Sequence, residues 1–189
     1  MRTDLSPFPP FRNHILHTEY EYDRLMQRIG EFVVSFQWLE DKFRDIGWLI
    51  EDPTRMSWPP KTLRNLTNFD LLNNVERAYL GLVDSLNIDN AEERKAAFQL
   101  LVSRCHEIRK YRNNLLHSAY VEMKSHNEVI GVIRSNPRIN TTTMAGDTTF
   151  DYVPLTADSV AYAMKDLAAQ SLALSTIYIE LLHMAPFTQ

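Results

Sequence analysis

A proline-free stretch from Phe11 to about Ile50 is the strongest constraint on the fold. Its apolar residues recur at intervals of three and four, which is the spacing of one face of a long helix. They are Tyr22, Leu25, Met26, Ile29, Phe32, Val33, Phe36, Leu39, Phe43, Ile46 and Ile50. Prolines between Glu51 and Pro60 end this pattern and predict a surface loop.

Two further helices are predicted after this loop. The segment Thr67–Asp70 resembles a capping box and predicts a helix that continues to about Leu86. The segment Asn90–Glu93 repeats this signal and predicts a third helix to roughly Tyr120.

The pattern then changes to short β-branched and aromatic runs. Val129–Ile133 and Thr148–Val153 are separated by a polar stretch, which predicts a β-hairpin or a pair of edge strands. Thr156 is a suitable N-cap for a last helix from Ala157 to about Met184. We therefore expect an all-α fold, a bundle of four to five helices with a small β-hairpin insertion before the last helix.

Composition limits the class of protein. The 189 residues suit one domain over residues 11–189, after a lead-in at 1–10 that holds three of the nine prolines. The net charge is −4 and Cys105 is the only cysteine, so we expect a cytoplasmic protein without a disulfide or a broad basic surface. Five glycines leave no glycine-rich phosphate loop. We expect no metal, no cofactor and no membrane segment, because the apolar run in the last helix is too short to span a bilayer.

One segment of the third predicted helix differs from the rest of the chain. Between Arg94 and Arg112 it holds six basic residues and one acid, Glu107, although the whole chain is acidic. Cations near a helix C-terminus also complement the helix dipole, which is the structural explanation of this segment. Cys105 lies on the apolar row of the helix and is predicted to belong to the core.

The same helix ends in Arg112, Asn113 and His117, an Arg-polar-x-x-x-His pattern. In this pattern the chain resembles the HEPN superfamily (higher eukaryotes and prokaryotes nucleotide-binding), whose members carry the motif late in a central helix of a four-helix bundle. The segment Phe36–Asp45 is similar to the first helix of such proteins. The β segment that follows the motif, and the Thr-capped helix after it, are also similar to the family pattern. The resemblance covers about residues 20–184, but only the motif is specific.

The resemblance implies a metal-independent endoribonuclease that serves as a toxin or an anti-phage defence effector. Its expected product is a 2′,3′-cyclic phosphate, made at a composite site in a homodimer. It also implies RNA as substrate and an antitoxin or regulatory protein as a further partner. The alternative is a non-catalytic HEPN-like dimeric module for interaction or nucleotide sensing, which the acidic charge balance favours; a third interpretation is a plain helical bundle.

The residue types suit RNA cleavage. His117 can exchange a proton near neutral pH, and Arg112 offers forked donors to phosphate oxygens. Asn113 stands four residues before His117, so its amide can orient the imidazole. Arg112 lies about 140° from His117 around an ideal helix, and two chains packed on this helix could close that gap. Arg109, Lys110 and Tyr120 flank the motif and are predicted to bind RNA.

Arg12, Asn13 and His17 repeat the motif near the N-terminus. A duplication, a second half of one site or coincidence would each produce this copy. We favour the later copy as the site because it follows a long helix and the basic segment, whereas the first copy follows a proline-rich tail.

Overall fold

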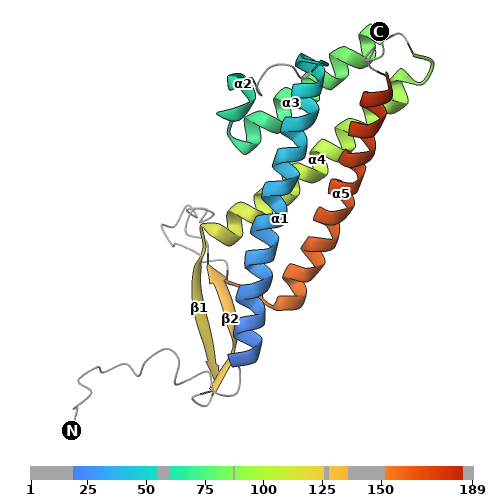
Figure 1. The fold of residues 1–189 in the computed structure, drawn as a ribbon. Coiled ribbons are helices and arrows are strands. Elements are labelled where there is room, and N and C mark those ends of the chain that lie inside the picture. The colour runs from blue at the N-terminus through green and yellow to red at the C-terminus, as the bar shows by residue number, and fades with distance from the viewer. Residues whose placement is uncertain (1–18, 55–59, 87, 126–127, 136–151, 185–189) are drawn as a thin grey trace, which may run out of the picture. The chain divides into compact units, whose positions relative to one another are not determined.

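The computed structural model describes residues 19–54, 60–86, 88–125, 128–135 and 152–184. Within these ranges the chain forms five helices and a three-stranded sheet (Figure 1). The predicted all-α class is confirmed, because helices hold most of the described residues. The lead-in at 1–10 and the motif copy at 12–17 lie outside the described ranges. The chain divides into two compact units, and the single domain over 11–189 stays a prediction.

The helical unit comprises Phe32–Arg112 and Ala163–Gln189. Its elements are α1 (Glu19–Glu51) from residue 32, α2 (Lys61–Arg64), α3 (Asn68–Leu86), α4 (Ala91–Leu116) up to residue 112, and α5 (Ala157–Met184) from residue 163. The apolar row predicted for the first helix supplies the fully buried side chains of Phe32, Phe36, Leu39, Phe43 and Ile46. This row forms the core together with buried residues of α2, α3, α4 and α5.

Close side-chain packing joins the helices of this unit. Tyr79 of α3 stacks on Phe98 of α4 with ring centroids 4.0 Å apart. A Cβ atom added to Gly47 of α1 would lie 3.0 Å from Val75 and 3.2 Å from Leu63. Glycine at this position therefore allows α1 to approach both α2 and α3 closely.

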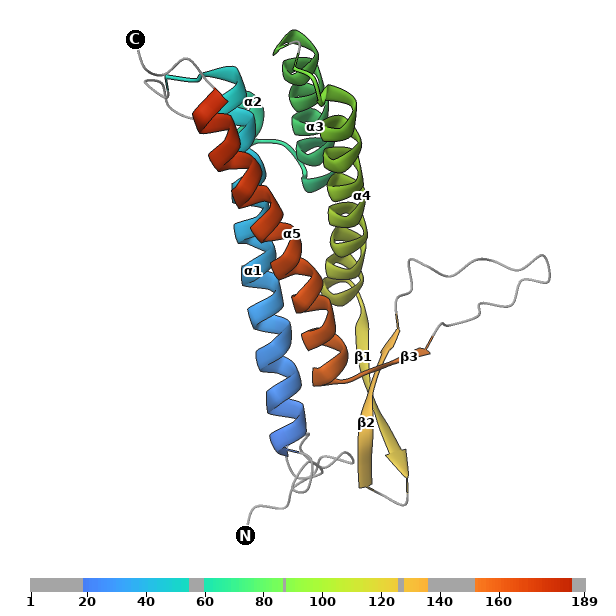
Figure 2. The same ribbon diagram turned by 90° about the vertical axis from the view of Figure 1, so that its right-hand side faces the viewer.

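The sheet unit comprises Met1–Glu31 and Asn113–Tyr162. Its strands β1 (Ala119–Ser125), β2 (Glu128–Ser135) and β3 (Tyr152–Leu155) form an antiparallel sheet with β2 in the centre (Figure 2). Val132 and Leu155 are paired in register across β2 and β3, and both are buried. Leu25, Leu115 and Val160 of this unit are also buried.

All three helices with a predicted capping residue begin directly after it. The Asn90 side chain accepts a hydrogen bond from Arg94 Nε at 3.0 Å, whereas the two threonines form caps. Thr67 Oγ1 accepts a hydrogen bond from the backbone N–H of Asp70 at 3.3 Å, and α3 begins at the next residue after Thr67. Thr156 Oγ1 accepts from the N–H of Ser159 at 3.1 Å, and Ser159 Oγ accepts from the N–H of Thr156 at 3.1 Å. These local exchanges satisfy amides that have no partner inside the helix.

Two predictions for the region after the third helix were wrong. The helix ends at Leu116 rather than near Tyr120, because β1 begins at Ala119. The predicted strand at 129–133 is confirmed within β2, but it pairs with β1 as well as with β3, so the insertion has three strands rather than two. The first part of the predicted second strand, 148–151, lies outside the described residues.

Candidate functional site

The first turns of α4 carry two of the six basic residues of the segment Arg94–Arg112. The Arg94 guanidinium donates to Glu180 of α5 at 2.7 Å. The Lys95 ammonium donates to Asp84 of α3 at 2.7 Å. Acids outside the segment thus neutralise both cations, and the positive charge available on α4 is smaller than the sequence count predicts.

Two arginines in the later turns of α4, Arg109 and Arg112, lie on aromatic rings. The Arg109 guanidinium lies 5.1 Å from the centroid of Phe69 in α3. The Arg112 guanidinium lies 5.7 Å from the centroid of Phe36 in α1. Both distances are within the range of cation–π attraction, which orients a guanidinium without cancelling its charge.

The three motif residues lie where α4 ends. Arg112 and Asn113 are half-buried near its C-terminus, and His117 is exposed directly after the last helical residue. The backbone N–H of His117 donates to the carbonyl oxygen of Asn113 at 3.0 Å. The helical hydrogen-bond pattern therefore continues through His117, and the predicted i, i+4 relation of these two residues is preserved.

Glu40 of α1 is a residue near Arg112 that was not predicted from the sequence. It is buried, and its Oε1 has no hydrogen-bond partner within the described ranges. Burial raises the pKa of its carboxyl, while the charges of Arg44 and Arg112 act in the opposite direction. Its position four residues after Phe36, on the apolar face of a helix, is the sequence signal that could have identified it.

Tyr120 lies in β1 rather than at the end of the third predicted helix. Its hydroxyl donates to the backbone carbonyl of Leu115 at 2.5 Å, and Ser118 Oγ donates to the carbonyl of Asn114. These bonds satisfy carbonyls that the end of α4 leaves without helical partners. The role of Tyr120 as an RNA-binding residue stays a prediction, with its hydroxyl engaged in this helix termination.

A groove of about 360 Å³ lies between α3 and α4, within the helical unit. Arg109 and Lys110, both predicted to bind substrate, are among its lining residues. The Phe69 ring is half exposed, and its centroid lies 5.3 Å from that of His106. We call this the α3–α4 groove.

His106 is held in the wall of this groove. Its Nε2 lies 3.1 Å from Asn73 Oδ1, and its buried Nδ1 has no partner among the described residues. Burial lowers the pKa of the imidazole, and the neighbouring charges of Arg109 and Lys110 lower it further. The ring is consequently neutral near pH 7 and presents one donor and one acceptor nitrogen.

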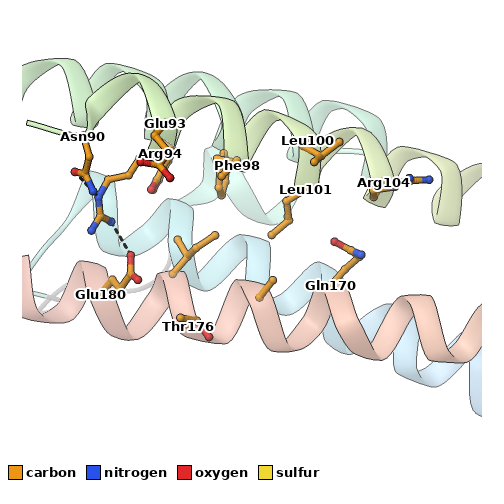
Figure 3. Close-up of a pocket in the computed structure, with 14 residues that line it drawn as sticks. Asn90, Glu93, Arg94, Phe98, Leu100, Leu101, Arg104, Gln170, Thr176 and Glu180 are labelled. Carbon is orange, nitrogen blue, oxygen red and sulfur yellow. Dashed lines mark hydrogen bonds and ion pairs between the residues drawn. The ribbon is translucent and has the colours of Figure 1, made fainter.

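A larger groove of about 670 Å³ lies between α4 and α5 (Figure 3). The ion pair of Arg94 and Glu180 occupies one end, and Arg104 and Gln170 lie at the other. Its lining is mainly apolar, and Leu100 at its rim is largely exposed. We call this the α4–α5 groove.

The predicted burial of Cys105 also has a structural outcome. Cys105 is fully buried in the core, as predicted, and burial raises the pKa of its thiol to about 12. Within the described ranges there is no group of three or more His, Cys, Asp or Glu side chains arranged to hold a metal ion. None of the described helices is long and apolar enough to cross a membrane.

Searches against protein-family models, curated proteins and solved structures found no match to this chain. The candidate site is therefore defined by its own geometry and by the resemblance carried by Arg112, Asn113 and His117.

Proposed function

We propose that this protein is a metal-independent endoribonuclease of the HEPN type, in which His117 performs acid–base chemistry and Arg112 binds the scissile phosphate. The observation that carries the proposal is the exposed imidazole of His117 at the end of α4, directly after the turn that holds Arg112 and Asn113. In the reaction, the 2′-hydroxyl oxygen attacks the neighbouring phosphorus and loses its proton, while the 5′-oxygen leaves and gains a proton. The products are a 2′,3′-cyclic phosphate and a 5′-hydroxyl.

Two further observations support these roles. Asn113 is half-buried and keeps its i, i+4 relation to His117, which suits an amide that orients an imidazole. Arg112 lies against Phe36 and near the buried carboxyl of Glu40, which limits the directions that its guanidinium takes. Restricted donors bind a phosphate with less loss of side-chain entropy than free ones.

The test is cleavage of a mixed RNA substrate in EDTA. We expect cleavage that leaves cyclic-phosphate ends and is lost in His117→Ala. His183→Ala is the matched control, because His183 is also exposed at the end of a helix but is not part of the motif. Equal activity of wild type and His117→Ala, or no activity in either, would contradict the proposed site.

We also propose that the site is composite and forms in a homodimer. The variants Arg112→Ala and His117→Ala should each be inactive, and mixing them should restore part of the activity. A mixed dimer would hold one site with the intact arginine of one subunit and the intact histidine of the other. No recovery after subunit exchange, checked with mass-tagged chains, would show that each site belongs to one subunit.

A second candidate function is a non-catalytic HEPN-like dimeric module for interaction or nucleotide sensing that works with a partner protein. The observation that favours it is the α4–α5 groove, whose apolar lining and exposed Leu100 resemble a recognition surface. Under this alternative, RNA is not cleaved, and substitution of Leu100 by Asp weakens partner binding while His117→Ala has no effect on it.

A further inference from the structure

The α3–α4 groove combines an exposed aromatic ring, a guanidinium and polar side chains in a small volume. Phe69 in the first turn of α3 leaves half of its surface to solvent. Arg109 lies against this ring at 5.1 Å, and His106 borders it at 5.3 Å between ring centroids. Large half-exposed aromatic side chains framed by a cation are the elements with which proteins stack nucleobases.

The groove also presents hydrogen-bonding groups of the right kind for a base edge. Asn73 and Glu76 of α3 line it together with the neutral imidazole of His106. Amides pair with bases through a donor and an acceptor, and a carboxylate accepts from an exocyclic amino group. Nδ1 of His106 and Nε of Arg109 are buried and have no partner in the described part of the chain.

The charges at the groove distinguish a base from a bare phosphate. Lys110 donates to the exposed Glu107 at 2.8 Å, and Glu76 adds a second carboxylate to the lining. Two acids against Arg109 and Lys110 give no net positive charge at the groove itself. A free phosphate or a double-stranded backbone is therefore a poor ligand, whereas a nucleobase with its single phosphate near Arg109 is a suitable one.

We propose that the α3–α4 groove binds one nucleobase of a nucleotide by stacking on Phe69, with Arg109 directed to the adjoining phosphate. Adenine, guanine and cytosine carry the exocyclic amino group that Glu76 can accept from, and uracil does not. The groove is separate from the motif residues Arg112, Asn113 and His117. The inference deepens the proposed function by assigning Arg109 a binding position, but its test measures binding and does not require cleavage.

The experiment measures binding in the His117→Ala background, so that no substrate is consumed. Fluorescence anisotropy follows labelled single-stranded 12-mers of A, C and U, and calorimetry follows AMP and UMP. We expect Phe69→Ala to weaken binding of the A 12-mer by about 5- to 150-fold, which is the usual effect of removing one stacking partner. Phe69→Trp should retain binding, because it keeps an aromatic face.

Trp38→Ala is the matched control, because Trp38 is also an exposed aromatic residue of the helical unit but lines a different groove, between α1 and α5.

Tighter binding of the 12-mer than of AMP assigns the groove to RNA, and equal affinity assigns it to a free nucleotide. The proposal is overturned if no nucleotide binds at millimolar concentration, if the U 12-mer binds as well as the A 12-mer, or if Phe69→Ala behaves like Trp38→Ala. Circular dichroism of each variant excludes unfolding as the cause. If the wild-type protein cleaves no RNA but the His117→Ala protein still binds nucleotide, the proposed ribonuclease function is refuted and the binding site is not.

Discussion

The two ends of α4 use the same residue types for different purposes. Near its N-terminus, Arg94 is paired with Glu180, and Tyr79 and Phe98 stack beneath it in the core. Near its C-terminus, Arg109 lies on a half-exposed ring rather than against an acid. The first end is built as structure, and the second leaves donors and an aromatic face accessible. The basic character of a helix is thus informative only after its partners from other helices are known.

The contrast between the two ends of α4 predicts that its largest effect is a difference in stability loss between substitutions of Phe98 and Phe69. Phe98→Ala removes a fully buried ring stacked on Tyr79, and should lower the free energy of unfolding by about 3–5 kcal/mol. Phe69→Ala removes a half-exposed ring, and should lower it by about 1 kcal/mol or less. Urea unfolding followed by circular dichroism measures both. Similar losses for the two variants would contradict the division of α4 into a structural and an accessible end.

The parts of this comparison that depend on local sequence were predictable. Thr67 and Thr156 start α3 and α5 as predicted, because a cap bonds to amides only a few residues away. The last helix has the predicted bounds, Ala157–Met184, because its start is capped and its apolar character is continuous.

The parts that depend on distant residues were not predictable. Glu180 stands 86 positions after Arg94, and Phe69 stands 40 positions before Arg109 in sequence number, so no local pattern reveals either pairing. The end of α4 was placed too late because Tyr120 fits an apolar helical pattern as well as a strand, and its pairing opposite Arg134 in β2 decides between them.

The second prediction concerns pH and the buried carboxyl of Glu40 in α1. Because burial raises its pKa in the folded state, the contribution of this carboxyl to stability is lost as pH rises from below the ordinary glutamate pKa through the raised value. Glu40→Gln lacks this ionisation. The free energy of unfolding of Glu40→Gln minus that of wild type should therefore increase as pH rises. This increase should be smaller than the effect of Phe98→Ala.

Urea unfolding of both proteins in matched buffers between pH 4 and pH 7.5 measures this difference. Glu31→Gln is the control, because hydrogen bonds from Gln27 and Arg28 lower the pKa of the half-buried Glu31 carboxyl, so the expected sign is reversed. A pH-independent difference for Glu40→Gln would show that Arg44 and Arg112 fully offset the burial of the carboxylate.

The third prediction tests the ion pair at the structural end. Arg94 and Glu180 are partly buried, with 26% and 42% of their side-chain surfaces exposed. A double-mutant cycle of Arg94→Gln and Glu180→Gln should give a coupling free energy of about 0.5–1 kcal/mol, and added salt should reduce it only in part. The pair of Arg24 and Asp158, which is more exposed, should couple less strongly. Stronger coupling in the exposed pair would contradict the assignment of Arg94 as structural.

The smallest effect is expected at Lys110 on the accessible end. Its ion pair with Glu107 lies within one helical turn, and both side chains are 60% exposed, so water and salt screen it almost completely. Lys110→Gln should shift the melting temperature by about 1 °C or less. Lys95→Gln should shift it further, because Lys95 is only 18% exposed and contacts both Asp84 and Glu92. Differential scanning fluorimetry at low and high salt compares the two lysines. A larger shift for Lys110 than for Lys95 would mean that its ammonium supports the fold rather than the groove, and the contrast between the two ends of α4 would then be limited to their arginines.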